Sequence, residues 1–214
     1  MTTAFEQELW LKYRFVAGVD EAGRGPLAGP VVAAAVIFER GYTPTRALQS
    51  VSDSKKLAPS VRLELAAAIR AEALAVGLSV VDADIIDKLN ILNATFLAMT
   101  RAVEQLSFCP DFLLIDGNRF KSTLTIPFQT IVKGDSKIFS IAAASILAKV
   151  HRDSLMLALD AQFPEYHFAQ HFGYPTPEHL DAIRKYGRCA IHRKSFKLAA
   201  LGEKPETQRN SKTP

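Results

Sequence analysis

The sequence has little cysteine and no long apolar run, and both absences narrow what the protein can be. Cys109 and Cys189 are far apart and match no metal-ligand spacing, so we expect two reduced thiols rather than a disulfide. No run approaches the roughly 20 apolar residues that span a bilayer. The stretch around Glu6 and Glu8 also lacks an apolar signal core. We therefore expect a cytoplasmic protein without a membrane partner.

Positive charge exceeds negative charge only modestly, with a formal net charge of +4, but it is distributed unevenly. The segment 182–202 contains no Asp or Glu and six basic residues, which are Arg184, Lys185, Arg188, Arg193, Lys194 and Lys197. Such a run is either an ordinary solvated face or a surface that neutralises nucleic-acid phosphates. The sequence leaves both interpretations open.

Apolar patterning predicts an α/β fold with a sizeable core, since 48% of the 214 residues are hydrophobic. Strands are expected over 14–19, 31–38, 78–81, 111–116 and 123–132. Helices are expected over 59–76, 85–106, 137–162, 177–186 and 192–200. This order of strands and helices indicates a mixed sheet flanked by helices.

Four carboxylates lie at or just after the ends of these predicted strands, or at a glycine turn: Asp20, Glu21, Asp116 and Asp135. Burying several unpaired carboxylates together is strongly unfavourable, because like charges repel and desolvation raises their pKa values. A divalent cation removes this difficulty, and Mg²⁺ suits a few carboxylates together with substrate phosphates. A pair of such ions is suited to phosphodiester hydrolysis.

Each carboxylate also has an ordinary structural alternative. Asp135 is placed to cap the following helix, and Asp116 fits a simple turn. Asp20 and Glu21 are harder to explain by packing, because they directly follow an apolar strand. Neighbouring strand residues point to opposite faces, so we expect the strand to break at or just after Asp20 if both carboxylates serve one site. Asp153 lies within a predicted helix, where we expect a solvated or salt-bridged role.

The stretch Gly23-Arg24-Gly25 follows the first carboxylate pair. Glycine permits positive φ and lets a ligand approach the backbone closely. Amide groups exposed in such a turn can bind phosphate or hydroxyl oxygens. Alone the pattern marks only a tight turn, but its position beside Asp20 and Glu21 makes it a candidate binding element.

Several stretches resemble, in order, the signature of the bacterial type 2 ribonuclease H family. They are Asp20-Glu-Ala-Gly-Arg-Gly-Pro-Leu-Ala-Gly-Pro-Val31, Asp53-Ser-Lys-Lys-Leu57, Leu114-Ile-Asp-Gly117, Lys133-Gly-Asp135, Ser140-Ile-Ala-Ala-Ala-Ser-Ile146, Ala148-Lys-Val150 with Arg152-Asp153, and Gly173-Tyr174. The resemblance implies a ribonuclease-H-like mixed central sheet flanked by helices, with a small helical C-terminal extension. It implies a catalytic domain over 1–162, the extension over 163–200 and a flexible tail over 201–214.

The resemblance also implies a function. It indicates an endonuclease that cuts RNA in RNA/DNA hybrids and single ribonucleotides embedded in duplex DNA, using Mg²⁺ or Mn²⁺ with two ions in the substrate complex. The metal ligands would be the four carboxylates named above. Substrate contacts would come from Gly23, Arg24, Gly25, Ser54, Lys55 and Tyr174. We expect a monomer.

Within this resemblance, the glycine turn would read the ribose 2′-hydroxyl and Tyr174 would stack on the neighbouring sugar. Ser54 and Lys55 would contact phosphates. Gln170-His-Phe172 departs from a His-Lys pair that is common in the family, which removes one basic phosphate contact.

Two other classes of function compete with this hypothesis. A non-catalytic nucleic-acid-binding module would use the basic segment 182–202, but it leaves the clustered carboxylates unexplained. A nucleotide-binding phosphotransferase would use the glycine turn, but the sequence lacks a Gly-x-x-x-x-Gly-Lys-Ser/Thr loop.

Overall fold

A mixed sheet organises the chain in the computed structural model, which describes residues 1–51, 57–198 and 202–203. Within these residues the sheet has five strands, in the order β3-β2-β1-β4-β5. The strands are β1 (Val16–Ala22), β2 (Val31–Ile37), β3 (Ala75–Val81), β4 (Phe112–Asp116) and β5 (Phe128–Ile131). β1 is antiparallel to β2, and β2 to β3, whereas β4 is parallel to both β1 and β5. The predicted mixed α/β sheet is confirmed.

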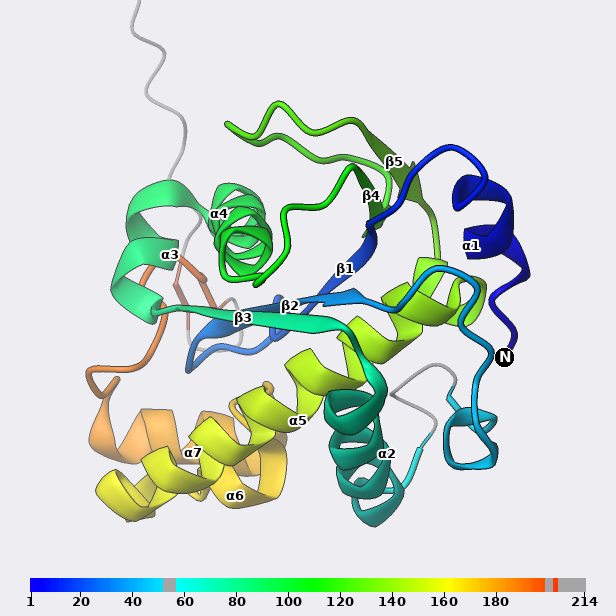
Figure 1. The fold of residues 1–214 in the computed structure, drawn as a ribbon. Helices are drawn as coiled ribbons and strands as arrows, with labels where there is room; N and C mark the ends of the chain where they lie inside the picture. The colour runs from blue at the N-terminus through cyan, green and yellow to red at the C-terminus, as the bar shows by residue number, and fades with distance from the viewer. Residues whose placement is uncertain (52–56, 199–201, 204–214) are drawn as a thin grey trace, which may run out of the picture.

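Both faces of the sheet are covered by helices, which explains why β2 is an unbroken apolar run (Figure 1). Val32, Ala34 and Val36 belong to the core cluster under α2 (Pro59–Glu72) and α5 (Phe139–Gln162). The alternate residues of β2 belong to the cluster under α4 (Ile91–Glu104). The long predicted helix over 137–162 is therefore α5, and it packs mainly against the central strands β1 and β2.

A short N-terminal helix, α1 (Ala4–Leu9), was not predicted, and it attaches to the start of α5. The Glu6 carboxylate accepts hydrogen bonds from the Ser140 backbone N–H and hydroxyl, each at 2.8 Å. Burial raises the pKa of Glu6, while the bonds from Ser140 oppose that rise. Glu6 thus satisfies orphan donors in the first turn of α5.

The single helix predicted over 85–106 is wrong, because the structure divides it into α3 (Ala83–Leu89) and α4. Asn90 between them has φ 66°, and its side chain accepts a hydrogen bond from the Asn93 N–H at 3.1 Å. The helical spacing of apolar residues continues across this break, so the sequence pattern does not reveal it. Asparagine is a favoured helix cap, and Asn90 caps α4 here, while its φ of 66° and ψ of 164° lie outside the left-handed helical region and cost conformational energy.

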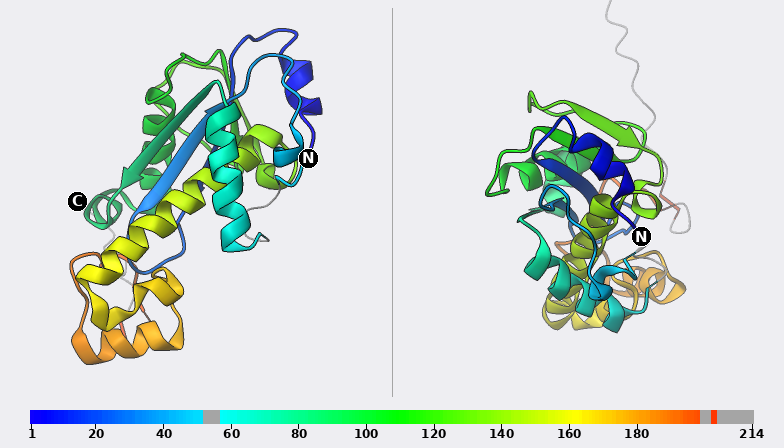
Figure 2. Two further views of the ribbon diagram at one scale, coloured as in Figure 1. Left: turned by 60° about the horizontal axis from the view of Figure 1, so that its bottom comes forward. Right: turned by 45° about the vertical axis from the view of Figure 1, so that its right-hand side comes forward.

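The C-terminal extension, residues 163–198 as described, packs beside the far half of α5 (Figure 2). It contains the 3₁₀ helix η4 (Pro164–Tyr166), α6 (Phe168–His171) and α7 (Pro177–Tyr186). The helix predicted over 192–200 is wrong for its described part, since residues 192–198 are not helical. Their backbone bonds go elsewhere: His192 bridges to Ala28, and the Arg193 N–H donates to the Leu27 carbonyl.

Smaller differences concern boundaries and short elements. α2 begins at Pro59 as predicted but ends four residues early, at Glu72, and β5 occupies only part of the predicted 123–132 strand. Two further 3₁₀ helices are η1 (Arg46–Leu48) and η3 (Gly134–Ser136). Among the described residues, no helix is both long enough and apolar enough to cross a bilayer. Cys109 and Cys189 form no disulfide, as predicted.

Candidate metal centre and nucleic-acid site

Three of the four predicted carboxylates converge where the two central parallel strands end. Asp20 and Glu21 lie on β1, and Asp116 is the last residue of β4. One oxygen from each carboxylate lies within 4.8 Å of the others. We call Asp20, Glu21 and Asp116 the carboxylate cluster. The parallel pairing of β1 with β4 brings it together, because the carboxyl ends of parallel strands meet at one edge.

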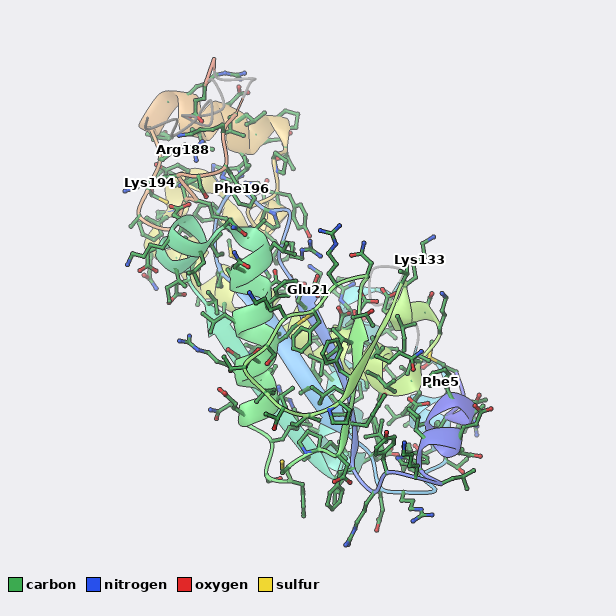
Figure 3. All side chains as sticks on the ribbon, turned by 90° about the horizontal axis from the view of Figure 1, so that it is seen from above. Phe5, Glu21, Lys133, Arg188, Lys194 and Phe196 are labelled. Atoms are coloured by element: carbon green, nitrogen blue, oxygen red, sulfur yellow. The ribbon has the colours of Figure 1, made fainter. Side chains whose placement is uncertain are left out.

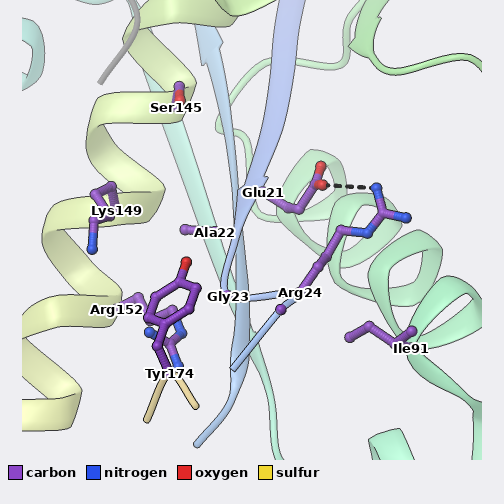
Figure 4. A pocket seen from close by; sticks show the side chains of 10 residues that line it. Glu21, Ala22, Gly23, Arg24, Ile91, Ser145, Lys149, Arg152 and Tyr174 are labelled. Carbon is purple, nitrogen blue, oxygen red and sulfur yellow. Dashed lines mark hydrogen bonds and ion pairs between the residues drawn. The ribbon is translucent and has the colours of Figure 1, made fainter. Parts of the chain in front are cut away.

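The strand break expected at Asp20 is wrong, because β1 continues through Ala22 and stays paired with β2. Instead, β1 extends past its other neighbour. The last β1–β4 pair is Val19 with Ile115, so beyond Val19 that edge of β1 is open. Asp20 lies on the α5 side, where Ser145 hydrogen-bonds it, whereas Glu21 points away from α5 (Figure 4). Because this edge of β1 is open, the Asp20 and Glu21 carboxylates can both reach the end of β4, where Asp116 lies.

The electrostatics of the carboxylate cluster favour a bound cation. Burial raises the pKa of Asp20 well above its usual value, and the negative charges of Glu21 and Asp116 raise it further. Burial also raises the pKa of Glu21, although Arg24 opposes this effect. Three hard oxygen donors fit Mg²⁺ or Mn²⁺, whose ligand oxygens stand at most about 4.2 Å apart at metal–oxygen distances of about 2.1 Å. Small side-chain rotations within a 4.8 Å cluster reach that spacing.

The fourth predicted carboxylate, Asp135, is not one of the three that converge. It lies in η3, is 8% exposed, and directly follows Gly134, whose N–H donates to Asp116 Oδ1 at 2.6 Å. The alternative interpretation of Asp135 as the cap of the long helix is wrong, because α5 begins at Phe139 with Ile138 at its N-cap. Asp135 is therefore a neighbour of the carboxylate cluster.

The glycine turn, Gly23-Arg24-Gly25, follows directly, and its two glycines serve different purposes. Gly23 has φ +96°, and a Cβ there would lie 2.1 Å from Arg152 Nε. A side chain at position 23 is therefore excluded by both conformation and space. A Cβ at Gly25 would meet only Tyr174 Cε1, at 3.6 Å, so this glycine leaves open space. Arg24, with its side chain half exposed, pairs with the Glu21 carboxylate at 3.2 Å.

A cavity of about 520 Å³ joins the glycine turn to Glu21 and Tyr174 (Figure 4). Its further lining residues were not among the predicted site residues; they are Ala22, Ile91, Ser145, Lys149 and Arg152. Sequence spacing could have found three of them. Ser145, Lys149 and Arg152 follow each other at i, i+4 and i+7 within a predicted helix, which places them on one face.

Ser54 and Lys55, the predicted phosphate contacts, lie outside the described residues. Asp153 forms ion pairs with Lys149 at 2.6 Å and with Arg62 at 3.7 Å. Its predicted salt-bridged role is confirmed, and the pair with Arg62 joins α5 to α2.

The basic segment 182–202 is only partly a surface run, and both interpretations of the sequence stay open for its exposed members, which are Arg184, Lys185, Lys194 and Lys197. Arg193 is fully buried, and Arg188 donates to the carbonyls of Arg193 and Phe196 at 2.7 and 2.8 Å. Arg184 pairs with Asp181 at 2.5 Å. Figure 3 shows Arg188, Lys194 and Phe196 at one end of the molecule, with Glu21 between them and Phe5. Two of the six basic side chains are thus occupied inside the protein.

Comparisons with known proteins agree with this arrangement. A solved ribonuclease H2 from Pyrococcus horikoshii has a TM-score of 0.73 and 25% identity, covering 87% of this chain and 96% of that chain. A Bst ribonuclease HIII solved in complex with Mn²⁺ has a TM-score of 0.57 and 22% identity, covering 81% of this chain and 63% of that chain. The mixed sheet and its flanking helices therefore define a ribonuclease-H-like fold.

The family follows from sequence relatives. The family model described as Ribonuclease HII matches residues 17–199. The Ribonuclease HII of Chloroherpeton thalassium is 59% identical over 95% of this chain and 100% of the relative. The chain belongs to the ribonuclease HII family and is a ribonuclease H. Membership supports ribonuclease H activity on RNA/DNA hybrids.

Proposed function

We propose that this chain hydrolyses the RNA strand of RNA/DNA hybrids and also cuts duplex DNA on the 5′ side of a single embedded ribonucleotide. The products carry 5′-phosphate and 3′-hydroxyl ends. One observation carries the proposal: two members of the carboxylate cluster, Asp20 and Glu21, lie on β1 directly before the glycine turn, and Glu21 and the turn line one cavity.

In this proposal, Asp20, Glu21 and Asp116 hold Mg²⁺ or Mn²⁺, and Asp135 joins them in the substrate complex. Their closely spaced oxygens and the raised pKa values of Asp20 and Glu21 support that role. Two bound ions would supply activation of a water molecule and stabilisation of the leaving 3′-oxygen. The carboxylates themselves fix where the scissile phosphate must lie.

The glycine turn and Tyr174 select the site of cutting. Backbone groups of Gly23-Arg24-Gly25 bind the ribose 2′-hydroxyl, which is the group that distinguishes RNA from DNA. Tyr174, which is 42% exposed, stacks on the next sugar from the opposite side of the cavity. Neither element reads a base edge, so we expect cleavage without sequence preference. Phosphate contacts by Ser54 and Lys55 stay a prediction.

The test is a cleavage assay on three labelled duplexes: an RNA/DNA hybrid, a DNA duplex with one ribonucleotide, and the same duplex without it. We expect cutting of the first two in Mg²⁺ or Mn²⁺, with the cut on the 5′ side of the ribonucleotide. The all-DNA duplex controls for general nuclease activity. Absence of cutting in both metals over a range of pH would contradict the proposal.

A non-catalytic binding module is the second candidate, and it has less support. Its basic segment has Arg188 and Arg193 occupied inside the protein, and its carboxylate cluster would repel phosphates without metal. Cytoplasmic location, action as a monomer and the division into 1–162 and 163–200 stay predictions. Apart from Gly202 and Glu203, the predicted tail lies outside the described residues.

A further inference from the structure

The loop from Gly23 to Pro30, which contains the glycine turn, lies between two buried arginines from other parts of the chain. Arg152 comes from α5 and is 1% exposed, and Arg193 comes from the C-terminal extension and is 0% exposed. A buried guanidinium is costly unless its donors are satisfied. Arg193 directs its side-chain hydrogen bonds to backbone carbonyls of this loop, and Arg152 donates to carbonyls of the loop and to that of Phe172.

Arg193 donates hydrogen bonds to the loop from four of its five guanidinium N–H groups. Its Nη2 donates to the Gly23 carbonyl at 2.6 Å, and its Nη1 donates to the carbonyls of Arg24 at 3.0 Å and Pro26 at 2.7 Å. Its Nε donates to the Gly29 carbonyl at 3.0 Å. The guanidinium therefore fixes four peptide planes of one loop at once.

The remaining carbonyls are held by Arg152 and by the Arg193 backbone. Arg152 donates to the carbonyls of Pro30 at 3.0 Å and Ala28 at 3.2 Å. The Arg193 N–H donates to the Leu27 carbonyl at 2.8 Å. Among the described residues, no such bond reaches the carbonyl of Gly25, which lines the cavity.

Fixing these carbonyls also fixes the direction of the neighbouring amides. A trans peptide unit is planar, so the C=O of one residue and the N–H of the next point in opposite directions. Because the carbonyls of Gly23 and Arg24 point to the buried Arg193, the N–H groups of Arg24 and Gly25 point away from it. Arg24 and Gly25 both line the cavity.

We propose that Arg193 is a positioning residue for ribonucleotide recognition: it holds the Gly23 and Arg24 carbonyls inward and so presents the amides of Arg24 and Gly25 to the substrate sugar. The inference rests on the proposed function and assigns it a residue outside the cavity. A direct phosphate contact by Arg193 is excluded, because the side chain is fully buried and four of its donors are used.

The charge and shape of arginine matter for this role. Burial and, to a smaller extent, the positive charge of Arg152 lower the pKa of Arg193 to about 9, so the side chain stays protonated at neutral pH. Lysine carries its three donors on one nitrogen and cannot span carbonyls from Gly23 to Gly29. The aromatic ring of Phe196, with its centroid 5.1 Å from the Arg193 guanidinium carbon, limits its movement from the other side.

The test measures binding selectivity, which a purely structural role would not change. In an Asp116→Asn background that prevents cutting, the dissociation constant is measured for a DNA duplex with one ribonucleotide and for the matched all-DNA duplex. We expect Arg193→Lys to weaken binding of the duplex with one ribonucleotide about tenfold, which corresponds to the free energy of one oriented hydrogen bond. Binding of the all-DNA duplex should weaken by less than about twofold. With Asp116 retained, Mn²⁺ should raise the melting temperature of the Arg193→Lys protein as it does that of the unsubstituted chain.

Arg188→Lys is the matched control, because Arg188 is an arginine of the same extension that donates to the carbonyls of Arg193 and Phe196 and not to the loop. Its selectivity should equal that of the parent. Phe196→Leu, which leaves the bonds of Arg193 in place, should lower selectivity by a smaller factor and carries the test if Arg193→Lys fails to fold.

Unchanged selectivity in a folded Arg193→Lys protein would overturn the inference, as would an equal loss in Arg188→Lys. If Arg193→Lys does not fold, unchanged selectivity in Phe196→Leu overturns it. Failure of the proposed function looks different, because the unsubstituted chain would then not cut the ribonucleotide-containing duplex at all.

Discussion

The carboxylate cluster, of which Asp20 and Glu21 directly precede the loop from Gly23 to Pro30, and the loop itself are stabilised in opposite ways. The cluster gathers like charges, and burial and mutual repulsion raise the pKa values of Asp20 and Glu21. The loop gathers carbonyl dipoles around two buried guanidiniums that satisfy them. In the proposed function, one half of the site would be completed by a cation from outside, whereas the other half is completed by guanidinium cations that the protein supplies.

The largest expected effect is from Asp116→Asn in the carboxylate cluster. The amide oxygen still accepts from the Gly134 N–H, but one negative metal ligand is lost. We expect cleavage to fall by more than about 100-fold, which exceeds the usual cost of altering an outer-shell partner, with most substrate binding retained. The melting temperature without metal should rise as repulsion falls, and the stabilisation by Mn²⁺ should shrink.

Calorimetry in EDTA and in Mn²⁺ measures the melting temperature without metal and the stabilisation by metal, both independently of activity. Lys149→Met is the comparison variant, because it leaves the cluster intact and alters the cavity that Glu21 of the cluster lines. Normal cutting by Asp116→Asn would contradict the assignment of the metal ligands.

The two glycines of the turn offer a contrast within the loop. Gly23→Ala places a Cβ 2.1 Å from Arg152 Nε at positive φ, so we expect unfolding to become easier by about 2–4 kcal/mol. Gly25→Ala adds a methyl in ordinary contact with Tyr174, at 3.6 Å, and should change stability by less than about 0.5 kcal/mol. It should instead raise KM by filling the cavity.

Denaturant melts and steady-state kinetics on both variants check this contrast. Equal stability losses would show that Gly25 is also constrained by the backbone, which the structure does not support.

Acid should act with opposite signs on the carboxylate cluster and on the C-terminal extension that packs against the loop. Burial lowers the pKa values of His179 and His192, which lie behind Tyr174, to about 4 each. Above pH 6.5 these histidines are neutral in both states. As pH falls from 6.5 to about 4, the unfolded chain binds protons first, so the free energy of unfolding falls by up to about 3 kcal/mol per histidine. The carboxylates of Asp20 and Glu21 act in the opposite direction, because their pKa values are raised.

Urea melts at pH 7, 6, 5 and 4 measure the net effect. Subtracting the same series for His179→Gln isolates the histidine contribution, since the carboxylates are common to both proteins. A difference that is constant with pH would contradict the buried, neutral state of this histidine.

The smallest effect should come from the exposed part of the basic segment. Arg184→Gln with Lys185→Gln removes two charges that are outside the loop contacts, and the slope of log affinity against log salt should flatten by at most about 2. Arg188→Gln should lower stability instead, because Arg188 binds internal carbonyls and Glu203. An unchanged slope in the double variant would leave this surface as a solvated face.

Sequence patterns predicted the layers of the fold well, because apolar runs and helical periodicity report burial directly. They could not show the break at Asn90, since periodicity passes through it. They also could not show that Glu21 reaches the cluster without a strand break, because this depends on β4 ending its pairing at Ile115. In the sequence, Arg193 is one member of a basic run, and its burial could not be predicted. That burial depends on carbonyls more than 160 residues away in the chain.

Amide hydrogen exchange with and without Mg²⁺ tests the central claim most directly. The claim is that the protein itself orders the loop, whereas the carboxylate cluster waits for metal. The amides of Leu27 and Gly29, which donate to the carbonyls of Gly173 and Ile191, should be equally protected in EDTA and in Mg²⁺. The amides of Glu21 and Gly134, bound to cluster carboxylates, should change. Loss of protection at Leu27 and Gly29 on metal removal would contradict the account.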